Sequence, residues 1–112
     1  MSAASVLEEN LEAIAKERNS ALAMLEINDL YVKKSEADMA EMLSLCEKDD
    51  RETMTAIEDR MEAFHQYKKN RTDMEDEINE LFNKREKEAR EEYEATLEQE
   101  KEEEQKEESE EE

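Results

Sequence analysis

Glu47-Lys-Asp-Asp-Arg-Glu-Thr53 is the stretch of sequence that decides between a folded-back chain and a continuous rod. A helical pattern of apolar residues runs on both sides of it, lapses within it and resumes in a different phase. Asp49 and Asp50 are good N-cap residues for a following helix, and Glu52 lies three residues after Asp49, in capping-box spacing. The sequence therefore predicts a chain reversal at residues 47–53.

The chain has neither glycine nor proline among its 112 residues. These two residue types make tight turns and break helices, so their absence favours long helices joined by very few turns. It also excludes phosphate-binding loops, dinucleotide folds, nucleophile elbows and EF-hand loops, all of which need glycine. The reversal must be made from ordinary residues.

The residues before the reversal follow one heptad frame, as in helices that pack against a partner helix. Polar residues interrupt the frame at Arg18, Asn28, Ser35 and Asp49. Arg18 and Asn28 either set the register of the pairing or mark an imperfect seam. The a and d positions of the frame hold Leu7, Leu11, Ile14, Ala21, Leu25, Val32, Met39, Met42 and Cys46.

The segment 21–32 is apolar on more than one face. Leu25 and Val32 lie on the seam, whereas Met24, Ile27 and Tyr31 form a second stripe at i, i+3 and i+7. Packing against one helix leaves such a second stripe in water. We therefore expect at least two neighbours around this segment, from its own chain or from other copies.

The residues after the reversal form a second seam. Met54, Ile57, Met61 and Phe64 step along it by three, four and three residues, and Tyr67 lies just off it. After a polar gap at 68–73 the apolar residues are Met74, Ile78, Leu81, Phe82, Ala89, Tyr93 and Leu97. Several of these follow an 11-residue repeat, which predicts a straighter helix than a heptad does.

These patterns predict an all-α fold, a long antiparallel helical hairpin or coiled coil that self-associates into a bundle. The hairpin unit is residues 1–97, with arms at about 3–47 and 50–97. Residues 98–112 include ten glutamates and no apolar residue, which predicts an acidic, disordered or frayed tail. The alternatives are a break at Ser35 and a continuous rod in a parallel oligomer.

The formal net charge is −20, and more than half of the excess lies in residues 86–112. Nucleic acids and anionic membranes repel such a chain, so we expect no direct contact with either. A protein with a basic patch is a compatible partner. We expect no transmembrane segment and, from residues 1–5, no secretory signal peptide. With a single cysteine, Cys46, the chain suits a reducing cytoplasmic location.

No catalytic, cofactor-binding or metal-binding site is expected. Glu62 and His65 form an E-x-x-H pair, half of the carboxylate-bridged di-iron motif, but His65 is the only histidine. Cys46 lies on an apolar seam among acidic residues, which suits a packing role better than a nucleophile. The sequence therefore predicts a protein that is not an enzyme and carries no cofactor.

We interpret the chain as a protein–protein interaction module, an acidic helical assembly factor, chaperone or adaptor. It binds a client through apolar helix faces, and it forms homo-oligomers or hetero-coiled-coils. The predicted interface is rich in methionine, an adaptable contact residue. Its residues are Leu22, Met24, Leu25, Ile27, Tyr31, Val32, Met39, Met42, Leu43, Met54, Ile57, Met61 and Phe64.

Two other functions remain open at this stage. A rigid acidic rod can mimic nucleic acid and block a DNA- or RNA-binding protein, although residues 48–85 are nearly balanced in charge. A passive coiled-coil scaffold is the other alternative, in which self-assembly consumes all of the apolar surface.

Overall fold

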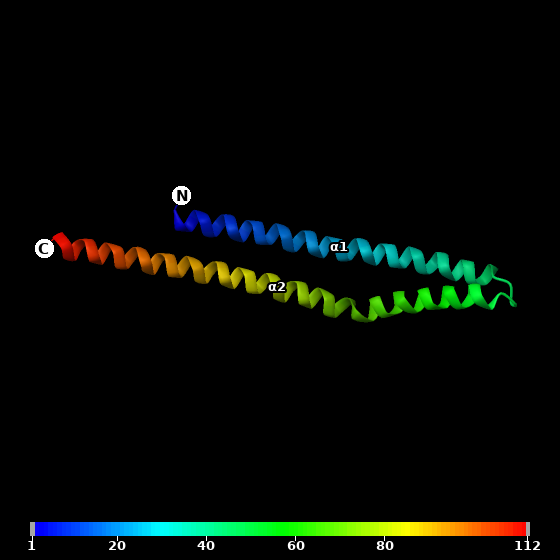
Figure 1. Ribbon diagram of the computed structural model, residues 1–112. Coiled ribbons are helices and arrows are strands. Elements are labelled where there is room, and N and C mark those ends of the chain that lie inside the picture. Colours follow the sequence, from blue (N-terminus) through cyan, green and yellow to red (C-terminus); the bar gives the residue numbers. More distant parts are fainter. Residues whose placement is uncertain (1, 112) are drawn as a thin grey trace. The chain divides into compact units, whose positions relative to one another are not determined.

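The computed structural model describes residues 2–111 and contains two α-helices (Figure 1). Helix α1 is Ala3–Leu45 and helix α2 is Arg51–Glu111. They pack against each other as an antiparallel hairpin, joined by residues 46–50. The predicted hairpin is confirmed, and neither the continuous rod nor a break at Ser35 occurs, since Ser35 lies inside α1.

Local hydrogen bonds cap the N-terminus of each helix and stabilise the turn between the helices. The backbone N–H of Ser5 donates to Ser2 Oγ at 3.1 Å, so Ser2 caps α1. In the turn, the N–H of Asp50 donates to the carbonyl of Glu47 at 3.0 Å. Asp50 Oδ1 then accepts from the N–H of Thr53 at 3.2 Å, which makes Asp50 the cap of α2. No residue of the described chain has a positive φ, so the turn needs no glycine.

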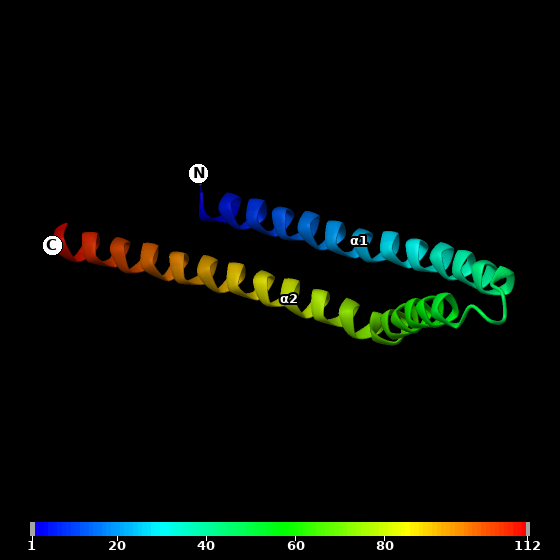
Figure 2. The ribbon, with the colours of Figure 1, turned by 45° about the vertical axis from the view of Figure 1, so that its right-hand side comes forward.

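The chain divides into two compact units. The first, here called the turn unit, is Ala21–Glu77 and contains the reversal. The second, here called the terminal unit, pairs the residues up to Ser20 with those from Ile78 onward. In each unit a portion of α1 packs against a portion of α2; Figure 2 shows the turn from a second side.

The core of the turn unit follows a seven-residue repeat. Leu25 and Val32 of α1 and Ile57 and Phe64 of α2 are its buried side chains. The two residues of each pair lie seven apart, the spacing of a coiled-coil seam. Half-buried apolar side chains extend this seam at Leu22, Met39, Leu43, Met54 and Met61.

Two positions of the predicted seam in α1 are wrong. Met42 and Asn28 are exposed, and the adjacent residues Leu43 and Asp29 are half-buried instead. An α-helix drifts by about 20° per heptad relative to a strict 3.5-residue repeat. This drift moves the seam toward the following residue at alternate positions of the frame, whereas Leu25, Val32 and Met39 stay on it.

The terminal unit follows an eleven-residue repeat. Ile14 and Phe82 are its buried side chains. In α2 the buried and half-buried line is Ile78, Phe82, Arg85, Ala89, Tyr93 and Thr96; in α1 it is Ala3, Leu7, Leu11, Ile14 and Arg18. Members of each line recur eleven positions apart, which confirms the predicted repeat around residues 78–93.

Helix α2 continues to Glu111, beyond the arm end expected at residue 97. Residues 101–109 are all exposed. Glutamate, lysine and glutamine are good helix formers, and no glycine or proline interrupts them. Within the described residues, neither helix has a stretch long and apolar enough to cross a membrane.

Candidate partner-binding surface

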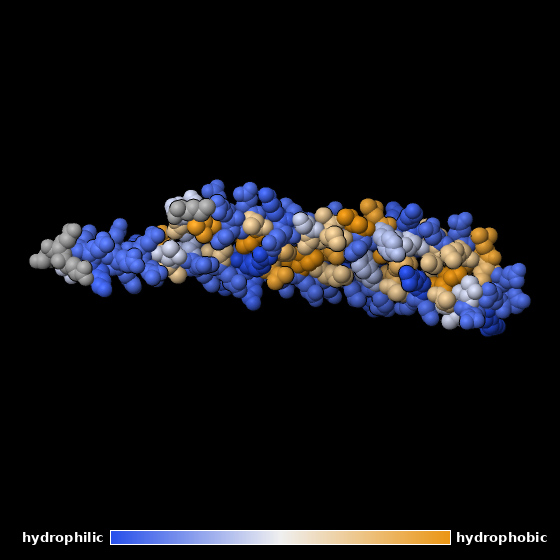
Figure 3. Space-filling model, turned by 45° about the horizontal axis from the view of Figure 1, so that its top comes forward, coloured by the Kyte–Doolittle hydropathy of each residue, from blue (hydrophilic) through white to orange (hydrophobic). Residues whose placement is uncertain are grey.

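Four large apolar side chains of α1 form an exposed surface on the turn unit. Met24, Ile27, Leu30 and Tyr31, here called the α1 stripe, are 59–69% exposed. At 100° per residue Ile27 and Leu30 lie on the side of α1 opposite to the buried Leu25 and Val32, and Met24 and Tyr31 lie on the flank between the two sides. Figure 3 shows orange, hydrophobic side chains at the surface of the face that it presents. The structure thus confirms that one partner helix leaves Met24, Ile27 and Tyr31 in water.

A second apolar surface of the turn unit is an open groove between α1 and α2. Its volume is about 540 Å³, and we call it the methionine groove. The buried Ile57 forms part of its wall, and Met42, which is 51% exposed, lies at its surface. Its lining residues are Met39, Met42, Glu52, Thr53, Ala56, Ile57 and Arg60.

All of the predicted interface residues fall within the turn unit, but they divide into three groups. Leu25, Val32, Ile57 and Phe64 are buried between the two helices. The half-buried group is Leu22, Met39, Leu43, Met54 and Met61, and the exposed group is Met24, Ile27, Tyr31 and Met42. Two further exposed residues, Leu30 and Leu45, were missed because neither falls on a predicted stripe.

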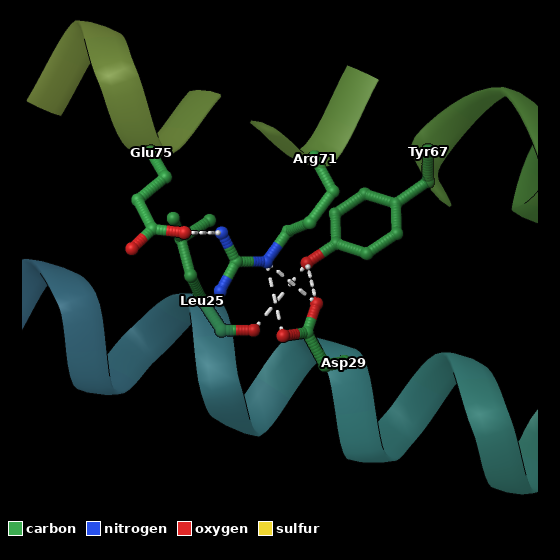
Figure 4. Close-up of polar contacts among 5 residues, drawn as sticks. All are labelled: Leu25, Asp29, Tyr67, Arg71 and Glu75. Carbon is green, nitrogen blue, oxygen red and sulfur yellow. Dashed lines mark hydrogen bonds and ion pairs between the residues drawn. The ribbon is translucent and has the colours of Figure 1, made fainter. Parts of the chain in front are cut away.

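A polar cluster joins the two helices beside the α1 stripe (Figure 4). Arg71 Nε donates to both carboxylate oxygens of Asp29, at 2.9 and 3.0 Å. The hydroxyl of Tyr67 donates to Asp29 Oδ1 at 3.0 Å, with the carbonyl oxygen of Leu25 at 3.4 Å. Arg71 Nη1 also pairs with Glu75 at 3.0 Å. Asp29, Tyr67 and Arg71 thus form one hydrogen-bonded network that links the two helices.

This cluster shifts the pKa values of its members. The hydrogen bond from Arg71 holds the pKa of Asp29 below its ordinary value of 3.8, although burial opposes this. Burial, followed by the hydrogen bond to Asp29, raises the pKa of Tyr67 above 10.0. The ionised carboxylate and the neutral phenol are therefore both favoured by folding.

We expect Asp29→Asn to lower stability at neutral pH and to have a smaller effect in acid. A carboxyl group whose pKa is depressed by folding stabilises the fold above its unfolded pKa of about 3.8. That contribution is lost as the pH falls through the lower folded value. Urea midpoints of the wild type and Asp29→Asn should converge in acid; Asp38→Asn, at an exposed position, is the control. A constant difference at all pH values contradicts this prediction.

Polar side chains also join the helices of the terminal unit. Arg18 Nη2 donates to Asn83 Oδ1 at 2.7 Å and pairs with Glu86 at 3.1 Å. Glu17 pairs with Arg85, whose guanidinium lies 5.2 Å from the ring centre of Phe82. Arg18 thus makes contacts with α2 at its predicted seam position. Asn28 does not lie at the seam; the adjacent Asp29 lies there instead and pairs with Arg71.

The remaining candidates for chemistry lie apart from one another. His65 and Glu62 are exposed, and Glu62 accepts a hydrogen bond from Gln66 at 3.0 Å. Cys46 is half-buried at the end of α1, where burial, with added repulsion from Asp50, raises the pKa of its thiol. A raised pKa lowers the fraction of reactive thiolate. Over the described residues, no group of three or more acidic, histidine or cysteine side chains is arranged to hold a metal ion.

The chain matches no protein-family model, and no curated protein or solved structure is significantly similar to it.

Proposed function

We propose that the protein is a non-enzymatic interaction module, an acidic helical assembly factor or adaptor that binds a client protein at the methionine groove. The observation that carries this proposal is the exposed apolar surface of the turn unit. Of the nine large apolar side chains exposed in the described chain, six lie in this unit, all on α1. Surfaces of this kind on soluble proteins mark interaction sites more often than chance.

The methionine groove suits an amphipathic helix of the client. Its two methionines come from α1, and its remaining lining residues come from α2. Methionine side chains are flexible and polarizable, so they adapt to differently shaped apolar residues. Leu45, which is 76% exposed, extends the apolar surface toward the turn. Helices that dock in such grooves insert apolar residues at i, i+3, i+4 and i+7.

The charge of the chain selects the kind of client. With a net charge of −20, the protein attracts basic proteins over long distances and repels acidic ones. The groove itself contains one acidic and one basic residue, Glu52 and Arg60. We therefore expect apolar contacts to hold the client and the surrounding negative charge to speed its association.

Met42→Asp tests the proposal. It places a charge at the surface of the methionine groove without entering the core, because Met42 is exposed. We expect recovery of a specific client in affinity purification to be lost, and its dissociation constant with purified components to rise about tenfold or more. Leu81→Asp is the matched control, since Leu81 is similarly exposed but lies on α2 of the terminal unit.

The same experiment separates the other two functions. Binding by a nucleic-acid mimic falls steeply with salt and depends on the acidic residues 98–112. Binding at an apolar groove persists at high salt and after deletion of residues 98–112. If Met42→Asp and Leu81→Asp behave alike and deletion of 98–112 abolishes binding, the groove is not the site. A passive scaffold recovers only copies of itself.

A further inference from the structure

We propose that the α1 stripe binds a second copy of this chain, with the two α1 helices antiparallel and related by a two-fold axis near residue 29. The stripe shares no residue with the methionine groove, whose α1 residues, Met39 and Met42, lie two or more helical turns further along α1. Dimerisation at the stripe and client binding at the groove can therefore be tested separately. The proposal assigns an occupant and an orientation to the surface that the hairpin leaves exposed.

The stripe is symmetric enough to pair with itself. In an antiparallel pair centred near residue 29, Ile27 of each copy lies level with Tyr31 of the other. Met24 lies level with Lys34 of the second copy, whose methylene groups can cover the thioether. A two-fold interface uses the same patch on both subunits, so it must be complementary to itself. The apolar centre of the stripe meets that condition.

The charges beside the stripe favour the antiparallel orientation. Glu26 and Lys33 are exposed and lie seven residues apart, so they share one flank of α1. Antiparallel pairing about a centre midway between them places Glu26 of each copy level with Lys33 of the other. The dimer therefore contains two such pairs. This centre coincides within one residue with that of the stripe. In a parallel pair the same flank faces the uncharged Asn28 and Ser35 instead.

The flank also argues for a second copy over a basic client. It contains one acidic and one basic residue, in a chain with more than twice as many acidic as basic residues. A uniformly basic partner leaves Lys33 without a partner charge, whereas a second copy pairs both Glu26 and Lys33. Four large side chains make a patch of a few hundred Å², so two copies together bury roughly 1,000 Å², the lower end of specific interfaces. The expected dimer is weak and reversible.

Charge reversal tests the proposed orientation. We expect Glu26→Lys and Lys33→Glu each to raise the dimer dissociation constant about fivefold to tenfold, because each turns two attractive pairs repulsive. The double variant restores both pairs with reversed sign and should dimerise like the wild type. Sedimentation equilibrium over a range of concentrations measures all four proteins. Ile27→Asp, in the centre of the stripe, should leave only monomer.

The two single variants separate specific pairing from general repulsion. They change the net charge by two units in opposite directions, so general repulsion predicts that one strengthens and the other weakens association. The proposal requires that both weaken it and that the double variant recovers. A monomeric wild type, unchanged single variants or a double variant as weak as the singles each overturns it. Helix content by circular dichroism should be the same throughout, because both residues are exposed.

Discussion

Phe82→Ala should lower the free energy of unfolding by about 3–4 kcal/mol, which is the largest single-residue effect that we expect. Phe82 is one of two buried side chains in the terminal unit. Its removal eliminates the apolar contact with α1 and also the ring beneath the guanidinium of Arg85. A two-helix interface can partly close over the lost volume, so the cost stays below the upper limit for such truncations.

Thermal unfolding followed by circular dichroism measures this effect, and Tm should fall by more than about 10 °C. Leu81→Ala is the control, because Leu81 is the adjacent residue of α2 and is 54% exposed. Its Tm should change by only a degree or two. Equal losses for the two variants would mean that Phe82 is not packed between the helices.

Leu25→Ala should cost about 3 kcal/mol, the second largest effect. Leu25 is 4% exposed, the lowest value among the buried side chains of the core. It packs beside the Asp29–Arg71 contact, so the lost volume also loosens the neighbouring polar cluster. We expect a lower urea midpoint with an unchanged slope, because the native fold remains but is less stable.

Leu30→Ala is a closely matched control for Leu25→Ala. Both are leucine-to-alanine changes in the middle of α1, so helix propensity changes equally, but Leu30 is 69% exposed. Its urea midpoint in the monomeric state should be close to that of the wild type. If Leu30→Ala is as destabilising as Leu25→Ala in dilute solution, the assignment of the two faces of α1 is wrong.

Much of the fold follows from local patterns in the sequence. The steps from Met54 to Phe64 place Ile57 and Phe64 on one helix face, and both are buried. Asp50 was one of two candidate caps, and it caps α2. These features depend on residues within one or two turns of each other, where helical geometry leaves little freedom.

Other features depend on contacts between residues far apart in the sequence. Arg71 lies in a stretch that reads as a polar gap, and only its pairing with Asp29, 42 residues away, places it at the helix interface. The exchange of Met42 for Leu43 at the seam results from helical drift accumulated over several turns. Neither could be predicted from residue types within a short window.

The change of repeat between the two units has a consequence for the accuracy of pairing. A single heptad repeat allows one helix to slide along the other by seven residues and recover similar contacts, so its register is ambiguous. The terminal unit repeats every eleven residues instead, so a slide of seven moves Arg85, Tyr93 and Thr96 onto exposed positions, although Ile78, Phe82 and Ala89 reach half-buried ones. A slide that keeps the seam of the turn unit therefore loses about half of the α2 seam of the terminal unit. This loss favours the observed alignment of the two helices over the shifted one.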